Sequence, residues 1–212
     1  GLRSTFYFLA GNEPGEHDFR YRISDPRVLG LLRQVHDRGH EVGLHASYDS
    51  YLSPVRIAFE FDALVQACRA AGFDQATWGV RQHYLRFRNP ETWAGHEAAG
   101  FEHDSTLGYA DAVGFRAGTC REYPLFDVQG RRPLALRERP LIVMDATLLG
   151  YNALALDAAT ARAVEIVDAC RRHGGDAVVL YHNSSLPTPA LRRHYVGLVD
   201  ALMRETDGRQ PD

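Results

Sequence analysis

Short apolar runs alternate along this chain with longer segments in which apolar residues recur every three or four positions. The runs predict about six strands, at residues 5–9, 41–44, 77–80, 101–104, 141–144 and 177–181. They are apolar throughout rather than alternating with polar residues, which is typical of strands buried on both faces of a parallel sheet. The pattern therefore predicts an α/β fold of strand–helix units around a mostly parallel sheet.

The segments between the runs carry the start and stop signals of helices. Three of them begin with a capping side chain followed by proline, at Asp25-Pro26, Ser53-Pro54 and Thr188-Pro189. Two shorter signals, Asn89-Pro90 and Asp157, predict further helix starts, and glycines mark the ends. Residues 109–139 show no clean period, and only a short strand at residues 114–116 is expected inside them.

Length and composition fit one ordinary globular domain. The chain has 212 residues, of which 45% are hydrophobic and 24% charged, and we expect a single domain over residues 1–212. No apolar run approaches the roughly 18 residues that a membrane-spanning helix needs. A membrane span is therefore not expected.

The charged residues exclude several kinds of function. All 24 basic residues are arginine and the net charge is −3. Without lysine there is no Schiff-base lysine and no phosphate-binding lysine of the Walker or kinase type. The absence of a basic excess also gives no footprint for nucleic acid or an anionic membrane.

The cysteines predict neither a disulfide framework nor a zinc knuckle. Cys68, Cys120 and Cys170 are odd in number, lie far apart and form no C-x-x-C pair. Cys68 and Cys170 fall on apolar helix faces, where cysteine acts as a small core residue. Free cysteines favour a cytoplasmic location.

Charged side chains and histidines follow nearly every predicted strand. In α/β folds, chemistry concentrates at the carboxyl ends of the strands. The residues found there are His45, Asp49, Arg81, His83, Asp104, Ser105, Arg116, Asp145, His182 and Asn183. This set favours a polar, charged pocket over an apolar ligand cavity.

Spacing alone leaves two interpretations of each of these residues open. His45 and Asp49 could share a divalent cation such as zinc, or be a core histidine beside a loop-capping aspartate, which spacing favours. His182 could donate a proton to a leaving group, or form a hydrogen bond with the backbone at a strand end. Arg81 could hold a catalytic carboxylate or a substrate anion, or be a surface cation.

Four segments together resemble the polysaccharide deacetylase family (carbohydrate esterase family 4, the NodB-like domain). Residues 39–45, GHEVGLH, resemble the family's GHEIGNH segment, and residues 79–84, GVRQHY, resemble its R-x-P-Y/F motif. Residues 178–182, VVLYH, resemble the last motif, an apolar strand that ends in Leu-His. Residues 5–8 are similar to the family's second strand, and all four segments follow the family's order.

The resemblance implies a distorted (β/α)7 barrel that removes N-acetyl groups from saccharides with the help of a divalent metal, zinc or another first-row metal. Carried over, His45 is the first metal histidine, His182 is the general acid and Arg81 steadies the general base. The position of the second metal histidine is Asp49 here. The sugar pocket is expected to be lined by His83, Tyr84, Asp104, Arg116 and Asp145.

The family's first motif, which carries the base and a metal aspartate, is expected before Gly1, so the barrel is expected to be incomplete at its N-terminal strand–helix unit. Three functions remain. The first is a metal-dependent deacetylase of a saccharide or glycoconjugate, which the joint presence of Arg81 and His182 favours. The second is a degenerate relative that binds a saccharide or a protein without turnover. The third is a related hydrolase of a non-sugar C–N bond.

Overall fold

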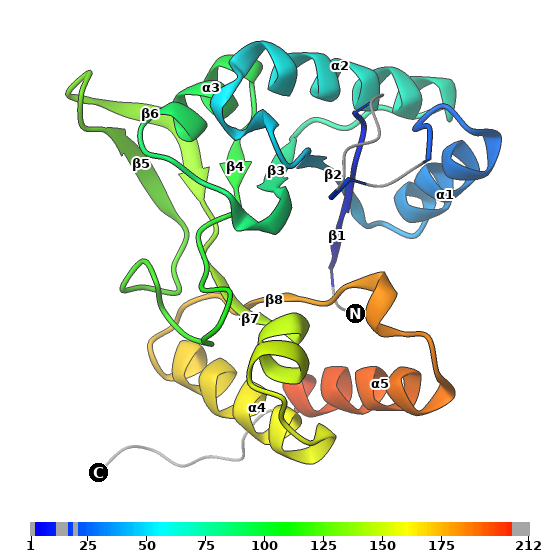
Figure 1. Ribbon diagram of the computed structural model, residues 1–212, viewed down its shortest axis with the longest axis vertical. Helices are drawn as coiled ribbons and strands as arrows, with labels where there is room; N and C mark the ends of the chain where they lie inside the picture. Colours follow the sequence, from blue (N-terminus) through cyan, green and yellow to red (C-terminus); the bar gives the residue numbers. More distant parts are fainter. Residues whose placement is uncertain (1–2, 12–16, 19–20, 205–212) are drawn as a thin grey trace. The chain divides into compact units, whose positions relative to one another are not determined.

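The computed structural model describes residues 3–11, 17–18 and 21–204 (Figure 1). Contacts divide the chain into two compact units, which are treated separately below. Unit 1 comprises Gly1–Thr106 and Tyr123–Arg139, and unit 2 comprises Leu107–Glu122 and Pro140–Asp212. The single domain expected from the sequence stays a prediction.

Unit 1 is built on a six-stranded sheet with the order β1-β2-β3-β4-β6-β5. Its strands are β1 (Thr5–Phe8), β2 (Glu41–Ala46), β3 (Gly79–Gln82), β4 (His103–Asp104), β5 (Tyr123–Asp127) and β6 (Arg132–Glu138). Neighbouring strands pair parallel from β1 to β6, and β5 pairs antiparallel with β6. The α/β fold with a mostly parallel sheet is therefore confirmed.

Helices of unit 1 cover this sheet and supply its core. They are α1 (Pro26–Asp37), α2 (Pro54–Ala70) and α3 (Glu91–Ala99), with short helices η1 (Ser50–Leu52) and η2 (His83–Leu85). Helices α1 and α2 pack against β2, and α3 packs against α2 and β6. The side chains of Leu32, Leu44, Ile57 and Leu64 are fully buried between these layers. Burying such side chains is the main favourable contribution to folding.

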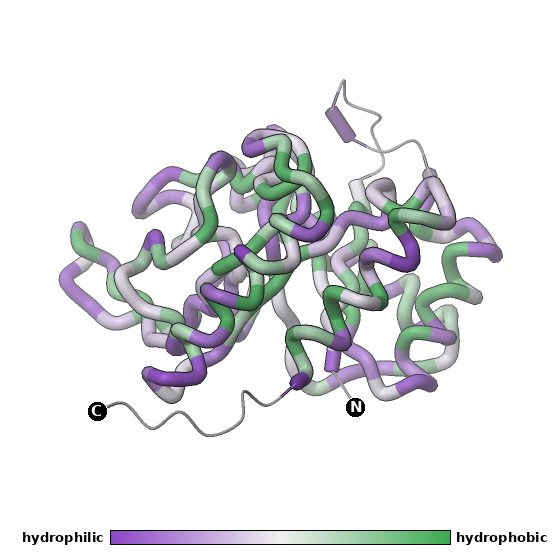
Figure 2. Tube along the Cα trace, turned by 90° about the horizontal axis from the view of Figure 1, so that it is seen from below, coloured by the Kyte–Doolittle hydropathy of each residue, from purple (hydrophilic) through white to green (hydrophobic). Residues whose placement is uncertain are grey.

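Two strands and two long helices form the core of unit 2. Strands β7 (Leu141–Met144) and β8 (Val178–Leu180) pair parallel. They are joined through η3 (Ala146–Tyr151) and α4 (Leu156–Arg172), and β8 is followed by η4 (Asn183–Ser185) and α5 (Pro189–Met203). Helix α4 packs against both α5 and β7. Figure 2 shows hydrophobic and hydrophilic residues interspersed along the helices, which is typical of amphipathic helices.

Predicted helix starts are confirmed where a side chain caps the backbone. Asp25, Ser53 and Thr188 accept hydrogen bonds from the backbone N–H groups of Arg27, Arg56 and Leu191, and proline follows each cap. The start at Asp157 is wrong, because α4 has Ala155 as its N-cap. Asp157 lies instead in the first turn, where its charge favours the helix dipole.

The segment 109–139, which has no clean period, contains the other difference between the predicted and the observed strands. Residues 114–116 form no strand, whereas the hairpin β5–β6 was not predicted. Strand β6 does alternate, but its third inward position is the buried carboxylate of Glu138, which breaks the apolar pattern. The turn between the strands is held by Asp127, whose Oδ1 accepts from the N–H groups of Gln129 and Gly130.

The described strands fall into two sheets, of six and of two strands, and a closed barrel is not shown. No helix among the described residues is long and apolar enough to cross a membrane. The fold thus places most of the predicted site residues at strand ends, in unit 1 and in unit 2, whereas Arg116 lies outside any strand.

Close packing between β1, β2 and β3 makes Gly43 a sensitive position. A Cβ atom there would lie 2.7 Å from the Tyr7 ring and 2.9 Å from the Gly79 carbonyl oxygen. We expect Gly43→Ala to lower the free energy of unfolding by about 1–3 kcal/mol, seen as a lower urea midpoint at unchanged slope. Gly30→Ala, in α1 with nothing within 4 Å, is the control and should not destabilise. Equal midpoints for Gly43→Ala and the wild-type protein would contradict this packing.

Candidate functional site

Unit 2 brings together a histidine and an aspartate that the sequence placed after neighbouring strands. Asp145 follows β7 and His182 follows β8, so parallel pairing sets both at the same edge. The imidazole Nδ1 of His182 lies 2.6 Å from Asp145 Oδ1, and the His182 backbone N–H donates to Oδ2 at 3.0 Å. The Asp145 side chain is fully buried, whereas the His182 side chain is 40% exposed. The carboxylate thus fixes the ring by Nδ1, which makes Nε2 the nitrogen for proton exchange.

Asp145 is held in its charged form. Burial raises the pKa of its carboxyl, but hydrogen bonds from His182 and Ser185 outweigh burial, so the pKa lies below its ordinary value. An anionic Asp145 accepts the hydrogen bond from Nδ1 of His182 and so orients the imidazole. This is the arrangement that a histidine needs in order to act as a general acid or base.

Unit 1 gathers a second group of side chains at the ends of β2 and β3. His45 Nδ1 donates to the Arg81 carbonyl oxygen at 2.8 Å, and the rings of His45 and His83 lie 4.8 Å apart, edge to face. His83 Nδ1 lies 2.8 Å from Asp18 Oδ1, and Asp18 also accepts from the Tyr48 N–H at 3.0 Å. Asp18 was not predicted as a site residue, because it lies in a polar loop without period or motif.

Arg81 is a buried cation, so its interpretation as a surface residue is wrong. It is 7% exposed, donates from Nε and Nη2 to Ser105 at 2.9 and 2.7 Å, and its guanidinium lies 4.5 Å above the Tyr7 ring. Burial lowers the pKa of the Arg81 guanidinium, although nearby acidic groups oppose this. Among the described residues no carboxylate forms an ion pair with it. A role for Arg81 in holding a catalytic carboxylate or a substrate anion stays a prediction.

The residues predicted to bind a metal do not make up a metal site by themselves. Asp49 is exposed, and its Oδ1 accepts from Arg86 Nη1 at 2.7 Å. In the part of the chain that the structure describes, no three His, Cys, Asp or Glu side chains come together as metal ligands. His45 and Asp49 alone therefore do not fit a three-ligand zinc site, and their metal role stays a prediction.

Aromatic rings border the unit 1 group. Tyr84 is 62% exposed and has a positive φ of 57°, which is uncommon for a residue with a side chain. Its ring lies 5.4 Å from that of Tyr48, and the Arg86 guanidinium lies 4.0 and 4.1 Å above the rings of Tyr48 and Tyr51. Such rings can contact the apolar face of a ligand while their hydroxyl groups stay in water.

The remaining predicted residues have internal partners. Asp104 is fully buried, where Oδ2 lies 3.0 Å from His96 Nδ1 and Oδ1 accepts from the Thr106 N–H at 2.7 Å. Arg116, in unit 2, donates to the Gly108 carbonyl oxygen at 2.8 Å. These contacts are structural, and the predicted substrate contacts of Asp104 and Arg116 stay predictions.

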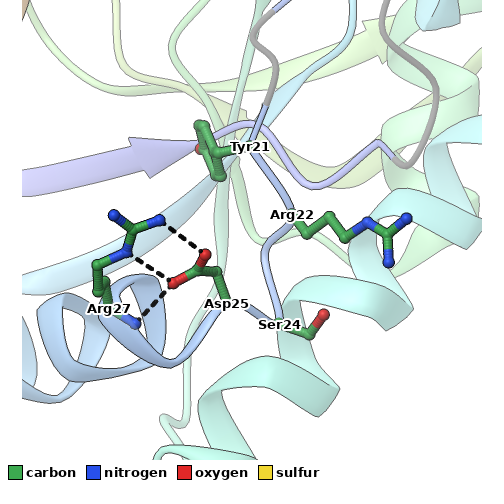
Figure 3. A pocket seen from close by; sticks show the side chains of 5 residues that line it. All are labelled: Tyr21, Arg22, Ser24, Asp25 and Arg27. Carbon is green, nitrogen blue, oxygen red and sulfur yellow. Dashed lines mark hydrogen bonds and ion pairs between the residues drawn. The ribbon is translucent and has the colours of Figure 1, made fainter.

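A pocket at the start of α1 contains none of the predicted site residues. Figure 3 shows its lining by Tyr21, Arg22, Ser24, Asp25 and Arg27. Asp25 is engaged three times by Arg27, through the backbone N–H and two guanidinium nitrogens at 2.9–3.2 Å. Its carboxylate therefore caps α1 and offers no chemistry of its own.

The lowered pKa of Asp145 makes the stability of the protein depend on pH. A depressed folded-state pKa contributes stability above the unfolded value near pH 4, and this contribution is lost as the pH falls through the folded value. We expect Asp145→Asn to lower the free energy of unfolding by about 1–3 kcal/mol at pH 7 and to flatten its fall between pH 5 and 2. Thermal unfolding over this range checks it, with the exposed Asp111→Asn as control. A pH dependence unchanged by Asp145→Asn would count against the buried contact.

Comparison with known proteins does not extend the resemblance. No protein-family model matches the chain, and no curated protein sequence matches it. The function is therefore inferred from the motifs along the chain and from the contacts of Asp145, His182 and Arg81.

Proposed function

We propose that this chain is an amide hydrolase that removes N-acetyl groups from a saccharide or glycoconjugate. The observation that carries the proposal is the contact between buried Asp145 and exposed His182. When an amide C–N bond breaks, the departing nitrogen must receive a proton. His182, oriented through Nδ1 by Asp145, presents Nε2 for this transfer.

A separate proposal concerns Arg81 of unit 1. In the hydrolysis, a water oxygen adds to the acetyl carbon and the water gives up a proton to a base. A carboxylate base needs a fixed cation to orient it, and buried Arg81 is such a cation without a carboxylate partner among the described residues. When the intermediate collapses, the C–N bond breaks, acetate and the free amine leave, and the amine nitrogen takes up one proton.

Two further elements of the proposal come from the resemblance alone. One is the distorted (β/α)7 barrel, and the other is a divalent metal, zinc or another first-row metal. The described residues do not fit a complete metal site, so metal content is a separate question for experiment.

A second candidate function is saccharide binding without turnover. It is favoured by Asp49, which stands where the resemblance implies a metal histidine and is engaged by Arg86. The exposed ring of Tyr84 would serve such binding as well as it would serve catalysis. The two functions differ in whether acetate is released.

Acetate release from oligomers of N-acetylglucosamine tests the proposal on the intact protein. We expect His182→Ala to lower kcat by about 10²–10⁴-fold with little change in KM, because it removes the proton donor and not the binding surface. We expect the kcat of Asp145→Asn to lie between that of His182→Ala and that of the wild-type protein. His173→Ala, an exposed histidine of the same unit, is the matched control.

Wild-type acetate release no faster than that of His182→Ala would sink the hydrolase proposal. Saccharide binding retained by both proteins would then support the second candidate. Treatment with a chelator, followed by addition of zinc, tests separately whether acetate release requires a metal. Loss and recovery of acetate release would establish a metal requirement, and unchanged release would reject it.

A further inference from the structure

Two cysteines that are far apart in the sequence meet in the core of unit 2. Cys120 and Cys170 belong to one buried cluster, with exposures of 6% and 0%. After burial, the neighbouring Cys120 side chain contributes to raising the pKa of the Cys170 thiol, and both are free thiols. Sequence spacing could not reveal this pair, since roughly 50 residues separate the two positions.

The backbone holds both cysteines against the same short segment. The Gly175 N–H donates to the Cys170 carbonyl oxygen at 2.9 Å, and the Asp176 N–H donates to the Cys120 carbonyl oxygen at 3.2 Å. A Cβ atom on Gly175 would lie 2.3 Å from Cys120 Sγ, so only glycine leaves room for the sulfur there. The proximity of the thiols is therefore built into the packing of this segment.

We propose that Cys120 and Cys170 are a modification site, at which a low-molecular-weight disulfide such as oxidised glutathione converts the two thiols into an intramolecular disulfide. The thiolate of one cysteine attacks a sulfur of the reagent and releases one glutathione thiol. The second cysteine then attacks the mixed disulfide and releases the other. The two cysteines lose two electrons and two protons, and the reagent gains them as two thiols.

Burial controls the rate of this reaction. It raises the pKa of Cys170 to about 12, so the thiolate is scarce and the reagent needs a local opening of unit 2. The bond forms slowly and is then protected, as a structural disulfide is, rather than switching rapidly. It ties the segment Leu107–Glu122, which carries Arg116, to the C-terminal end of α4.

Cys68 provides an internal comparison. It is fully buried in α2 of unit 1, and burial raises the pKa of its thiol to about 12 as well. Cys68 is the one cysteine in the sequence of unit 1. A thiol that is equally buried but has no second thiol in its own unit should stay reduced. A difference in the extent of oxidation between Cys68 and the pair then reports the proximity of the two thiols and not their exposure to the reagent.

The experiment treats the full chain with oxidised glutathione and counts free thiols after denaturation. We expect the number of free thiols per chain to fall from three to one. Proteolysis and mass spectrometry should then find a single cross-link, between Cys120 and Cys170. The cross-linked protein should unfold at a temperature higher by about 5 °C or more, because the closed loop restricts the unfolded chain. Cys68→Ser should oxidise like the wild-type protein, whereas Cys120→Ser and Cys170→Ser should form no intramolecular disulfide.

A parallel arm refolds the protein from urea in the same reagent, which removes the need for local opening. All three thiols remaining free in both arms, or a cross-link that includes Cys68, would overturn the proposal. Oxidation in the refolding arm alone supports it and assigns the slow rate to burial. None of these measurements involves a saccharide, so the outcome is independent of the proposed hydrolase.

Discussion

Parallel pairing of neighbouring strands decides which polar side chains of this protein meet. In unit 1, His45 pairs with Arg81 across β2 and β3, and the His45 ring accordingly reaches the Arg81 carbonyl oxygen. In unit 2, Met144 pairs with Leu180, so Asp145 and His182 follow at the same edge. A slip of one residue would turn each side chain to the opposite face of its sheet. The chemistry of both units therefore depends on strand register.

Register also explains which parts of the site the sequence could predict. Strand ends are local features, so His45, Arg81, Asp145 and His182 were found by counting residues after apolar runs. Helix starts with a capping side chain and proline were found for the same reason. Contacts between distant segments leave no local pattern, which is why the hairpin β5–β6, the role of Asp18 and the cysteine pair were missed.

Each unit contains a histidine–aspartate contact at a strand end, but the two contacts differ in how the aspartate is held. In each, a carboxylate lies beside Nδ1 of a histidine at a strand end, at 2.8 Å for Asp18–His83 and 2.6 Å for Asp145–His182. Asp18 accepts from His83 and from the Tyr48 N–H, whereas Asp145 accepts from both the ring and the backbone N–H of His182 and from Ser185. An imidazole with both contacts is more narrowly oriented, and orientation is what proton transfer to a leaving group requires. His182 is thus the more closely held of the two histidines.

Buried charge near β2 shows how the fold supports this polar edge. Glu60 of α2 is buried, and although its contacts with Ser47 and Arg56 lower the pKa of its carboxyl, burial outweighs them and raises it. The Ser47 N–H donates to Glu60 at 2.9 Å, which fixes the chain directly after β2. Breaking such a contact leaves a buried polar group without a partner, which costs more than the contact gains. The arrangement favours one conformation of the segment between His45 and Asp49, so the packing of α2 on β2 helps to position these two side chains.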